Sequence, residues 1–415
     1  MFAGYGSRIL IQAVYFVLIA RSLGAEQYGA FVAVTALISI ISPFVGLGAT
    51  NLIVKNVVRA PGLLSEYWGN GLLMTVLTGA GFLLLVAVAN QLLLPRAVAL
   101  STLLLVGISD LILSRVIDLA GFTFQAVEAL AKTAQIQVFP NFARLVGIVI
   151  LSLVVPHPSA ATWAFAYLAA TIATTIFALG LVTVQFGWPR LAIYRICPEL
   201  AEGFYFSVSL AAQSIYSDID KTMLARMGSL DAAGIYAAAC RIIDVSFTPV
   251  RSLLNAAYPG FFRHGIEGIR SSLCYGRRLV SPALVYSIGA AVAILLSAPL
   301  LPWILGPEFA RTASALRWLA LLPLIKTVHY FLADALTGAG FQGLRTCAQV
   351  IVATASVLLN SWAIPIWGWR GAVWSSIASD SLLAVLMSAL AFALCRRLAT
   401  SSTSRGSLPV VVERT

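Results

Sequence analysis

Apolar stretches of about twenty residues recur along the whole chain, separated by short polar connections. A helix needs ~20 apolar residues to cross the hydrocarbon core of a bilayer, so each stretch is long enough for one crossing. Twelve stretches are found, at 3–20, 29–49, 71–94, 97–120, 136–155, 162–186, 203–226, 232–258, 279–300, 314–337, 345–367 and 371–395. The pattern predicts an all-α polytopic membrane protein with about twelve transmembrane helices.

Two short connections have similar sequences. Residues 18–31 read LIARSLGAEQYGAF and residues 223–236 read MLARMGSLDAAGIY, a constant offset of 205 residues (from 18 to 223). Because six predicted helices separate the two turns, the halves have the same orientation and are related by a pseudo-two-fold axis along the membrane normal. The sequence therefore predicts an N-lobe at 1–190, a cytoplasmic linker at 191–202, a C-lobe at 203–397 and a cytoplasmic tail at 398–415.

Positive charge is distributed unevenly between the two sides of the predicted bundle. Cytoplasmic loops retain Lys and Arg, so the richer side is the cytoplasmic one. With the N-terminus inside, that side holds Lys55, Arg59, Lys132, Arg190, Arg195, Arg263, Arg270, Arg277, Arg278, Arg345, Arg396, Arg397, Arg405 and Arg414. Both termini are therefore expected in the cytoplasm.

Composition narrows the function classes. Hydrophobic residues make up 60% of the chain and charged residues only 10%, whereas soluble proteins are ~25% charged. The net charge of +11 is too scattered for nucleic acid, but it suits an anionic lipid or an anionic cargo. The five cysteines show no CxxC spacing, so no metal, disulfide or cofactor is expected.

Several helices carry polar groups at the depth of the bilayer, where an ionisable side chain costs roughly 2.5–3.5 kcal/mol. Each such group needs a partner or a water-filled lining. In the first helix, steps of three and four residues place one polar stripe on a single face: Tyr5, Arg8, Gln12 and Tyr15. The eighth helix repeats these steps over a longer stripe: Arg241, Asp244, Thr248, Arg251 and Asn255.

Charged residues in four further helices extend this pattern: Arg115, Asp118, Arg144, Asp218, Asp220, Lys221, Lys326, His329 and Asp334. Three pairs lie one turn apart and can form structural salt bridges instead of a site: Arg115 with Asp118, Asp218 with Lys221, and Arg241 with Asp244. No acidic residue lies one turn from Arg8 or Arg251 on the same helix. These two cations are expected to face a cavity, with pairing across helices as the alternative.

Signatures of catalysis are missing from the connections between helices. The longest connections carry no acid pair at catalytic spacing and no GxSxG turn, and the chain has no GxxxxGK[ST] phosphate loop. An enzyme is therefore not expected. A purely structural membrane protein has no reason to bury so many cations, which leaves transport.

Several segments resemble one family of transporters. They are IARSLGAEQYGAF, GLGATNLIVKN, SDIDKTMLARMGSLDAAGIYAAACRIID, LPWILGPEF, ALTGAGFQGLR and IPIWGWRGAVWSSIASD. Together they are similar to the polysaccharide-transport branch of the multidrug/oligosaccharidyl-lipid/polysaccharide (MOP) exporters, the Wzx-type flippases of O-antigen and other lipid-linked oligosaccharides. Major facilitators also have twelve helices in parallel halves, but their Gly-rich, Asp-Arg and Arg-Arg loop is missing from 51–70.

The resemblance implies a function in polysaccharide biosynthesis. Such flippases move an undecaprenyl-pyrophosphate-linked oligosaccharide from the cytoplasmic to the periplasmic leaflet of the bacterial inner membrane by alternating access. Glycan polymerases and chain-length proteins are possible partners. The alternative is a MATE-like, cation-coupled multidrug exporter, because the acidic residues Asp218 and Asp220 are compatible with a cationic substrate or coupling ion.

The resemblance and the polar stripes together give three groups of candidate residues. A cationic cavity would bind the pyrophosphate through Arg8, Arg251, Arg241, Lys221, Lys326 and Arg144. Sugar contacts are expected from Tyr5, Gln12, Tyr15 and Asn255. Coupling or ion pairing is expected from Asp218, Asp220, Asp244, His329, Asp334, Arg115 and Asp118.

Overall fold

The computed structural model describes residues 2–405, with side chains outside 2–10, 51, 58–59, 130, 195–203, 205–206, 209 and 397–405. The described chain is helical throughout and contains no strand. Its helices are α1 (Phe2–Ile41), α2 (Ala49–Arg59), α3 (Leu64–Val88), α4 (Asn90–Leu93), α5 (Leu100–Gly107), α6 (Ser114–Ala126), α7 (Leu130–Val154), α8 (Ala160–Phe186), α9 (Ile196–Met227), α10 (Leu230–Gly265), α11 (Ile269–Ser297), α12 (Leu301–Leu305), α13 (Ala310–Leu319), α14 (Leu322–Gly338), α15 (Gln342–Trp367) and α16 (Trp369–Arg405).

These helices confirm the predicted fold class and its number of crossings. Eight are long and apolar enough to span a membrane, and the bent pair of α13 and α14 makes a ninth. Helices α9 and α10 are also long enough, at 32 and 36 residues, but they are too polar to belong to this set. Helix α1 contains two of the predicted crossings, because Gly24 interrupts its helical geometry (φ 71°, ψ 173°). About twelve crossings result.

Three of the predicted spans differ from the helices that the structure contains. The span predicted at 314–337 bends by 48° between α13 and α14, because Pro323 in the first turn of α14 cannot continue a preceding helix. A π-helical segment, Ile108–Leu113, joins α5 to α6. Helix α16 continues to Arg405, into the segment expected as a loose tail, and residues 406–415 lie outside the described residues.

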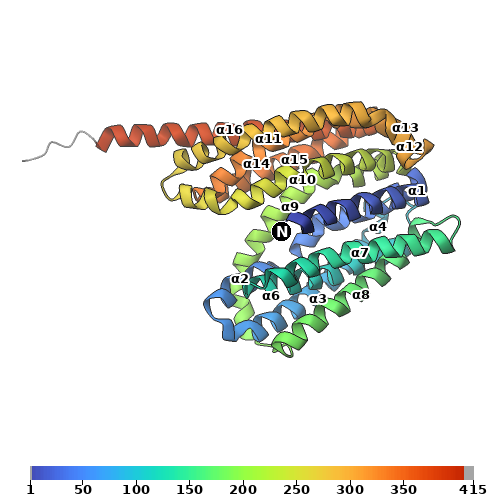
Figure 1. Ribbon diagram of the computed structural model, residues 1–415, viewed down its shortest axis with the longest axis horizontal. Helices are drawn as coiled ribbons and strands as arrows, with labels where there is room; N and C mark the ends of the chain where they lie inside the picture. Colours follow the sequence, from blue (N-terminus) through green and yellow to red (C-terminus); the bar gives the residue numbers. More distant parts are fainter. Residues whose placement is uncertain (1, 406–415) are drawn as a thin grey trace, which may run out of the picture.

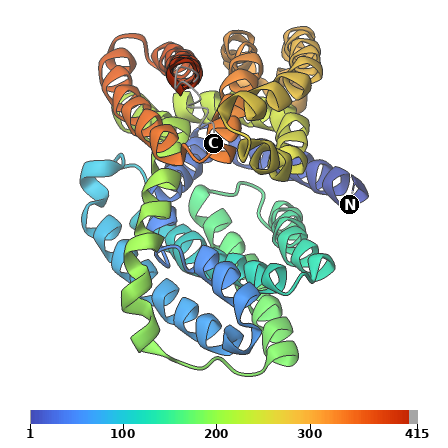
Figure 2. The same cartoon turned by 90° about the vertical axis from the view of Figure 1, so that its left-hand side faces the viewer.

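The helices form two groups that meet along α1, α9 and α10 (Figure 1). Helices α2–α8 make up one group and α10–α16 the other, while α9 runs from the first group to the second (Figure 2). Helix α1, which breaks at Gly24, turns back at one end of the bundle, called here the kink end, and α16 leaves from the opposite end, called the tail end (Figure 1). The limits of 1–190, 191–202 and 203–397 for the lobes and linker stay a prediction.

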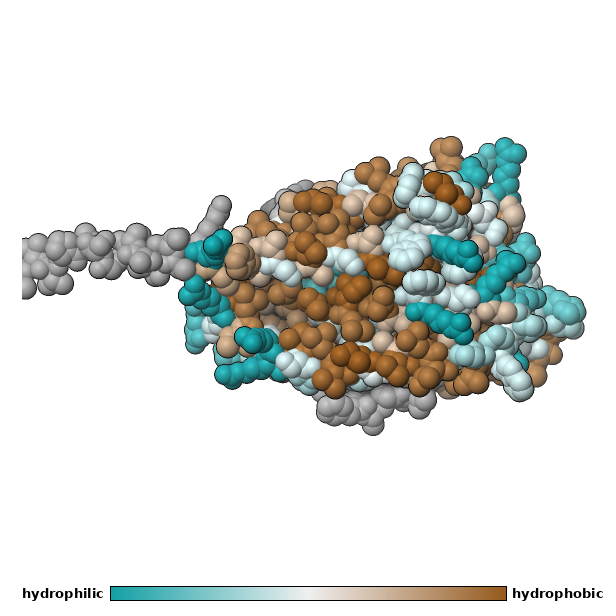
Figure 3. Space-filling model, turned by 90° about the horizontal axis from the view of Figure 1, so that it is seen from above, coloured by the Kyte–Doolittle hydropathy of each residue, from teal (hydrophilic) through white to brown (hydrophobic). Residues whose placement is uncertain are grey.

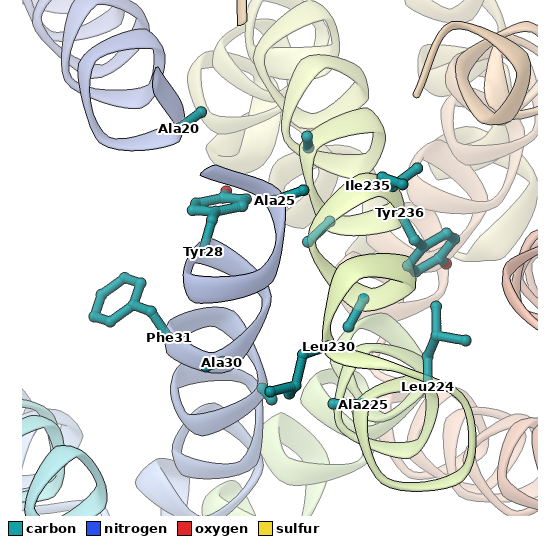
Figure 4. Close-up of a cluster of buried hydrophobic side chains, with 14 of the residues drawn as sticks. Ala20, Ala25, Tyr28, Ala30, Phe31, Leu224, Ala225, Leu230, Ile235 and Tyr236 are labelled. Atoms are coloured by element: carbon teal, nitrogen blue, oxygen red, sulfur yellow. The ribbon is translucent and has the colours of Figure 1, made fainter. Parts of the chain in front are cut away.

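The two repeat segments pack against each other where α1 crosses α10. An added Cβ on Gly29 would lie 1.8 Å from the carbonyl oxygen of Leu230, and one on Gly234 would lie 2.0 Å from that of Ala25. The contact is reciprocal, because residues 25 and 29 correspond to residues 230 and 234 in the repeat. Figure 4 shows Ala25 pointing toward α10 from the same crossing. Reciprocal contact of equivalent residues is the geometry of a two-fold interface.

Further contacts at the kink end tie the groups together. The Arg21 guanidinium donates to the Trp303 carbonyl (3.5 Å), and that of Arg226, its repeat equivalent, donates to the Leu92 carbonyl (3.4 Å). The Glu308 carboxylate accepts from the Ala25 amide (2.9 Å) and so caps the second half of α1 after Gly24. Backbone crossing and polar contacts together join the two groups of helices at the kink end.

The outer surface has the distribution of residues expected for a membrane protein. Figure 3 shows apolar residues over the central part of one face and hydrophilic residues toward both ends. Large apolar side chains are exposed on the long helices, as at Leu77 (61%), Val184 (89%) and Val285 (71%). Lipid tails would cover them, since exposed apolar areas of this extent are unusual on soluble monomers.

Candidate functional site

Three adjoining cavities lie where the two groups of helices meet. The charged chamber has a volume of about 510 Å³ and is bounded mainly by α9, α10, α14 and α16. The aromatic chamber, about 340 Å³, lies beside α1, α8 and α10. The amide chamber, about 450 Å³, lies between α1, α6 and α7. Arg241 lines all three, so its guanidinium lies at their junction.

The charged chamber brings together residues that the sequence analysis selected on separate helices. Its acidic and basic lining residues are Arg115, Asp218, Asp220, Lys221, Arg241, Asp244, Arg251, Lys326 and Asp380. Two ion pairs form within it: Lys221 Nζ lies 2.5 Å from Asp218 Oδ1, and Lys326 Nζ lies 3.6 Å from Asp244 Oδ1. The first pair is the one expected from a spacing of one helical turn.

Asp244 pairs across helices, not along its own helix. Lys326, Lys221, Arg251 and Arg241 all lie within electrostatic range of its carboxylate. The closest contact is with Lys326 of α14, so the pair of Arg241 with Asp244 suggested by the spacing is not formed among the described residues. A partner on a facing helix can lie closer than one a turn away, which spacing along a single helix does not reveal.

Arg241 and Arg251 make no ion pair within the described part of the chain. Arg251 is exposed to the charged chamber, and its guanidinium lies 6.0 Å from the centre of the Phe247 ring. Arg241 is partly buried at the junction of the three cavities. Neither guanidinium is thus ion-paired with a carboxylate, although both lie within electrostatic range of Asp244.

Two buried acidic residues hold polar networks at the wall of the charged chamber. Asp220 accepts hydrogen bonds from the hydroxyls of Tyr236 and Ser376, the latter at 2.9 Å. Asp380 lies 3.1 Å from His329 Nε2, and both side chains are buried. Sequence reasoning missed Asp380. The signal was present, because a carboxylate within an apolar span needs a partner.

The aromatic chamber contains Tyr15 and a cation that stacks on an aromatic ring. The Arg144 guanidinium lies 4.3 Å from the centre of the Tyr167 ring and 3.5 Å from Asp110 Oδ1. The Tyr167 hydroxyl donates to the same carboxylate oxygen at 2.8 Å. Phe31 lies beside Tyr167, with 5.6 Å between ring centres. Tyr167 and Asp110 were not among the predicted site residues, and the sequence around Tyr167 carries no signal for this role.

The amide chamber contains Gln12 from the first predicted stripe. Gln12 Nε2 donates to Asn141 Oδ1 (3.2 Å), and Asn141 Nδ2 donates to the Gln137 carbonyl (3.1 Å). Asp118 also lines this chamber and pairs with Arg115 at 3.3 Å, as its spacing suggested. Carboxamides from α1 and α7 therefore meet across a cleft.

The remaining predicted residues lie elsewhere or are not described. The side chains of Tyr5 and Arg8 are outside the described residues. Asn255 is exposed on α10 and lines none of the three chambers. Asp334 is buried and pairs with Arg345 at 3.4 Å, away from the chambers, which indicates a contact between α14 and α15.

The fold is similar to that of membrane transporters of known structure. An inward-facing multidrug resistance MATE family transporter of the MOP superfamily aligns with a TM-score of 0.76 and 14% identity, covering 96% of each chain. The lipid II flippase MurJ in an inward closed conformation aligns with a TM-score of 0.71 and 13% identity, covering 93% of this chain and 86% of that one. An outward-facing multidrug resistance MATE family transporter of the MOP superfamily aligns with a TM-score of 0.66 and 13% identity, covering 98% of this chain and 96% of that one.

The sequence itself identifies the family. The model of the family described as "Polysaccharide biosynthesis protein" matches residues 1–264, more than half of the chain. The chain therefore belongs to this family and has the fold of MOP superfamily transporters, as the sequence analysis expected. A comparison with curated protein sequences gives no match.

Proposed function

We propose that this protein is a flippase that moves an undecaprenyl-pyrophosphate-linked oligosaccharide across the bacterial inner membrane. The two unpaired guanidiniums of Arg241 and Arg251 carry the proposal. A pyrophosphate that links a lipid to a sugar carries two negative charges, which match these two cations. Charge-assisted hydrogen bonds from guanidinium to phosphate are short and strong, and they are stronger still in a cavity screened from bulk water.

Ion pairs in the same chamber support this assignment by accounting for the other cations. Lys221, Lys326 and Arg115 have carboxylate partners: Asp218, Asp244 and Asp118, respectively. The paired groups keep the chamber polar and hydrated at low cost, while the unpaired arginines attract the anion. An anion brought into the bilayer without such compensation pays a prohibitive desolvation cost. The polyprenyl tail remains in the lipid, because only the head group needs a polar path.

We place the tail end in the cytoplasm, because the connections there carry most of the Lys and Arg residues. Pro43, Leu210 and Arg251 line the charged chamber. In this proposal, the close crossing of α1 and α10 at Gly29 and Gly234 would close the kink end. The head group would enter from the cytoplasmic leaflet, and a rocking of the two groups of helices would then open the kink end to the periplasm.

A complementation experiment in the source strain tests the proposal. Deleting the gene is expected to abolish the surface glycan, and the wild-type gene is expected to restore it. Arg251→Ala should fail to restore the glycan at an unchanged amount of protein in the membrane, whereas Arg251→Lys should restore it in part. Full restoration by Arg251→Ala would remove this residue from the site.

A cation-coupled drug exporter is the second candidate, and the carboxylates of the charged chamber favour it. Asp218, Asp220, Asp244 and Asp380 all line that chamber and could bind a cationic drug or a coupling ion. This function predicts drug sensitivity without a glycan defect when the gene is deleted. The flippase predicts a glycan defect without drug sensitivity.

A further inference from the structure

The three chambers differ sharply in chemistry, although they share the wall at Arg241. Charged side chains dominate the charged chamber. The amide chamber instead holds four carboxamides from three helices: Gln12, Gln125, Gln137 and Asn141. Two of its three charged residues, Asp118 and Arg144, have ion-pair partners on Arg115 and Asp110. Only Arg241 contributes a charge without such a partner.

We propose that the amide chamber is the saccharide-binding subsite, and that the head group spans two chambers with its pyrophosphate at Arg241. The inference rests on the proposed flippase function and adds the orientation of the cargo. In a lipid-linked oligosaccharide, the anionic pyrophosphate is bonded directly to a neutral, hydroxyl-rich sugar. In the protein, the charged chamber adjoins the neutral, amide-rich chamber, and Arg241 lies between them.

Hydrogen-bonding capacity in the amide chamber is largely unused. Each carboxamide offers two N–H donors and an oxygen with two lone pairs, a combination that suits hydroxyl groups, which both donate and accept. Gln12 and Asn141 use part of this capacity on each other. The side chains of Gln125 and Gln137 make no hydrogen bond within the described part of the chain, and both are exposed to the cleft. They are therefore free to bind hydroxyls in place of water.

An aromatic side chain completes the subsite. Phe122 of α6 adds to the lining of the amide chamber an apolar surface, against which the apolar face of a sugar ring can pack. Donors, acceptors and an apolar face are the elements needed to bind a pyranose.

Binding measurements with two lipids test this assignment. The probes are undecaprenyl pyrophosphate, which carries no sugar, and the lipid-linked oligosaccharide extracted from a strain that lacks the gene. Dissociation constants are measured with the purified protein in nanodiscs. Gln137→Leu and Asn141→Leu should each weaken binding of the oligosaccharide lipid about tenfold. Their affinity for undecaprenyl pyrophosphate should stay within about twofold of wild type, which also shows that the variants are folded.

Two controls separate the inference from the function on which it rests. Gln342→Leu removes an exposed carboxamide at the start of α15, outside the three chambers, and should change neither constant. Arg241→Ala should weaken both lipids. Equal affinities of wild type and the Gln137 and Asn141 variants for the oligosaccharide lipid would overturn the saccharide subsite alone. A wild-type protein that binds neither lipid would overturn the flippase and the subsite together.

Discussion

The crossing of Gly29 and Gly234 should control which side of the protein is open. An added methyl group at Gly29 would lie 1.8 Å from the Leu230 carbonyl oxygen, whereas ordinary van der Waals contact begins at 3.4 Å. Gly29→Ala therefore requires α1 and α10 to separate by about 1.6 Å, the difference between these distances. The obstacle is backbone, so a change of side-chain rotamer cannot relieve it.

The expected size of the effect follows from the cost of overpacking. Forcing an extra carbon into a filled contact costs about 1–3 kcal/mol. This cost falls only on the state in which the kink end is closed, so the closed population should fall relative to the open one by about 5- to 150-fold. Gly234→Ala meets the Ala25 carbonyl oxygen at 2.0 Å and should act in the same direction.

Distances between spin labels would measure this shift. A Gln91→Cys and Arg311→Cys pair, in a background without the native cysteines, places one label on each group of helices at the kink end. Gly29→Ala should move the distance distribution toward longer values. Gly180→Ala, in α8, is the matched control, because an added methyl group there meets nothing within 4 Å. A distribution for Gly29→Ala that matches Gly180→Ala would refute the role of the crossing.

Two further substitutions probe the charged chamber. His329→Leu leaves the buried Asp380 carboxylate without the imidazole that lies 3.1 Å away. Breaking a buried pair costs about 3–5 kcal/mol of the free energy of unfolding, so the thermal unfolding temperature in detergent should fall clearly below that of wild type. An unchanged temperature would contradict this pairing. Asp244→Asn removes the negative charge that lies among four cations. Because these cations then act on the bound anion alone, the affinity for undecaprenyl pyrophosphate should rise about tenfold. Weaker binding would contradict the assignment of the chamber to an anion.

Much of the fold follows from the sequence, because crossing a bilayer constrains the chain so strongly. An unpaired backbone polar group in lipid is too costly, which leaves helices of fixed minimum length as the solution. The apolar stretches therefore located the crossings, although some helices begin earlier than predicted, as α11 does at Ile269 and not at 279. The repeat correctly paired Gly29 with Gly234. The close approach of these two glycines was not predictable, since a sequence match gives equivalence and not contact.

The candidate site was less predictable, because its contacts join distant helices. The stripe on α10 located Arg241 and Arg251, and helical spacing gave the pair of Asp218 with Lys221. Spacing cannot choose between a partner on the same helix and one on a facing helix, so it missed the contact of Asp244 with Lys326. Of the four carboxamides in the amide chamber, only Gln12 was predicted as a sugar contact, because carboxamides are common on exposed helix faces and become informative only when several converge.

Transport by the reconstituted protein tests the central claim most directly. Proteoliposomes containing the lipid-linked oligosaccharide would be treated from outside with a glycosidase, and the fraction of glycan cleaved over time would report its movement between leaflets. Wild-type protein should expose glycan from the inner leaflet, and the Arg241→Ala/Arg251→Ala double variant should remain at the rate of protein-free vesicles. Transport by the double variant at the wild-type rate would contradict the proposal that these two unpaired arginines carry the pyrophosphate.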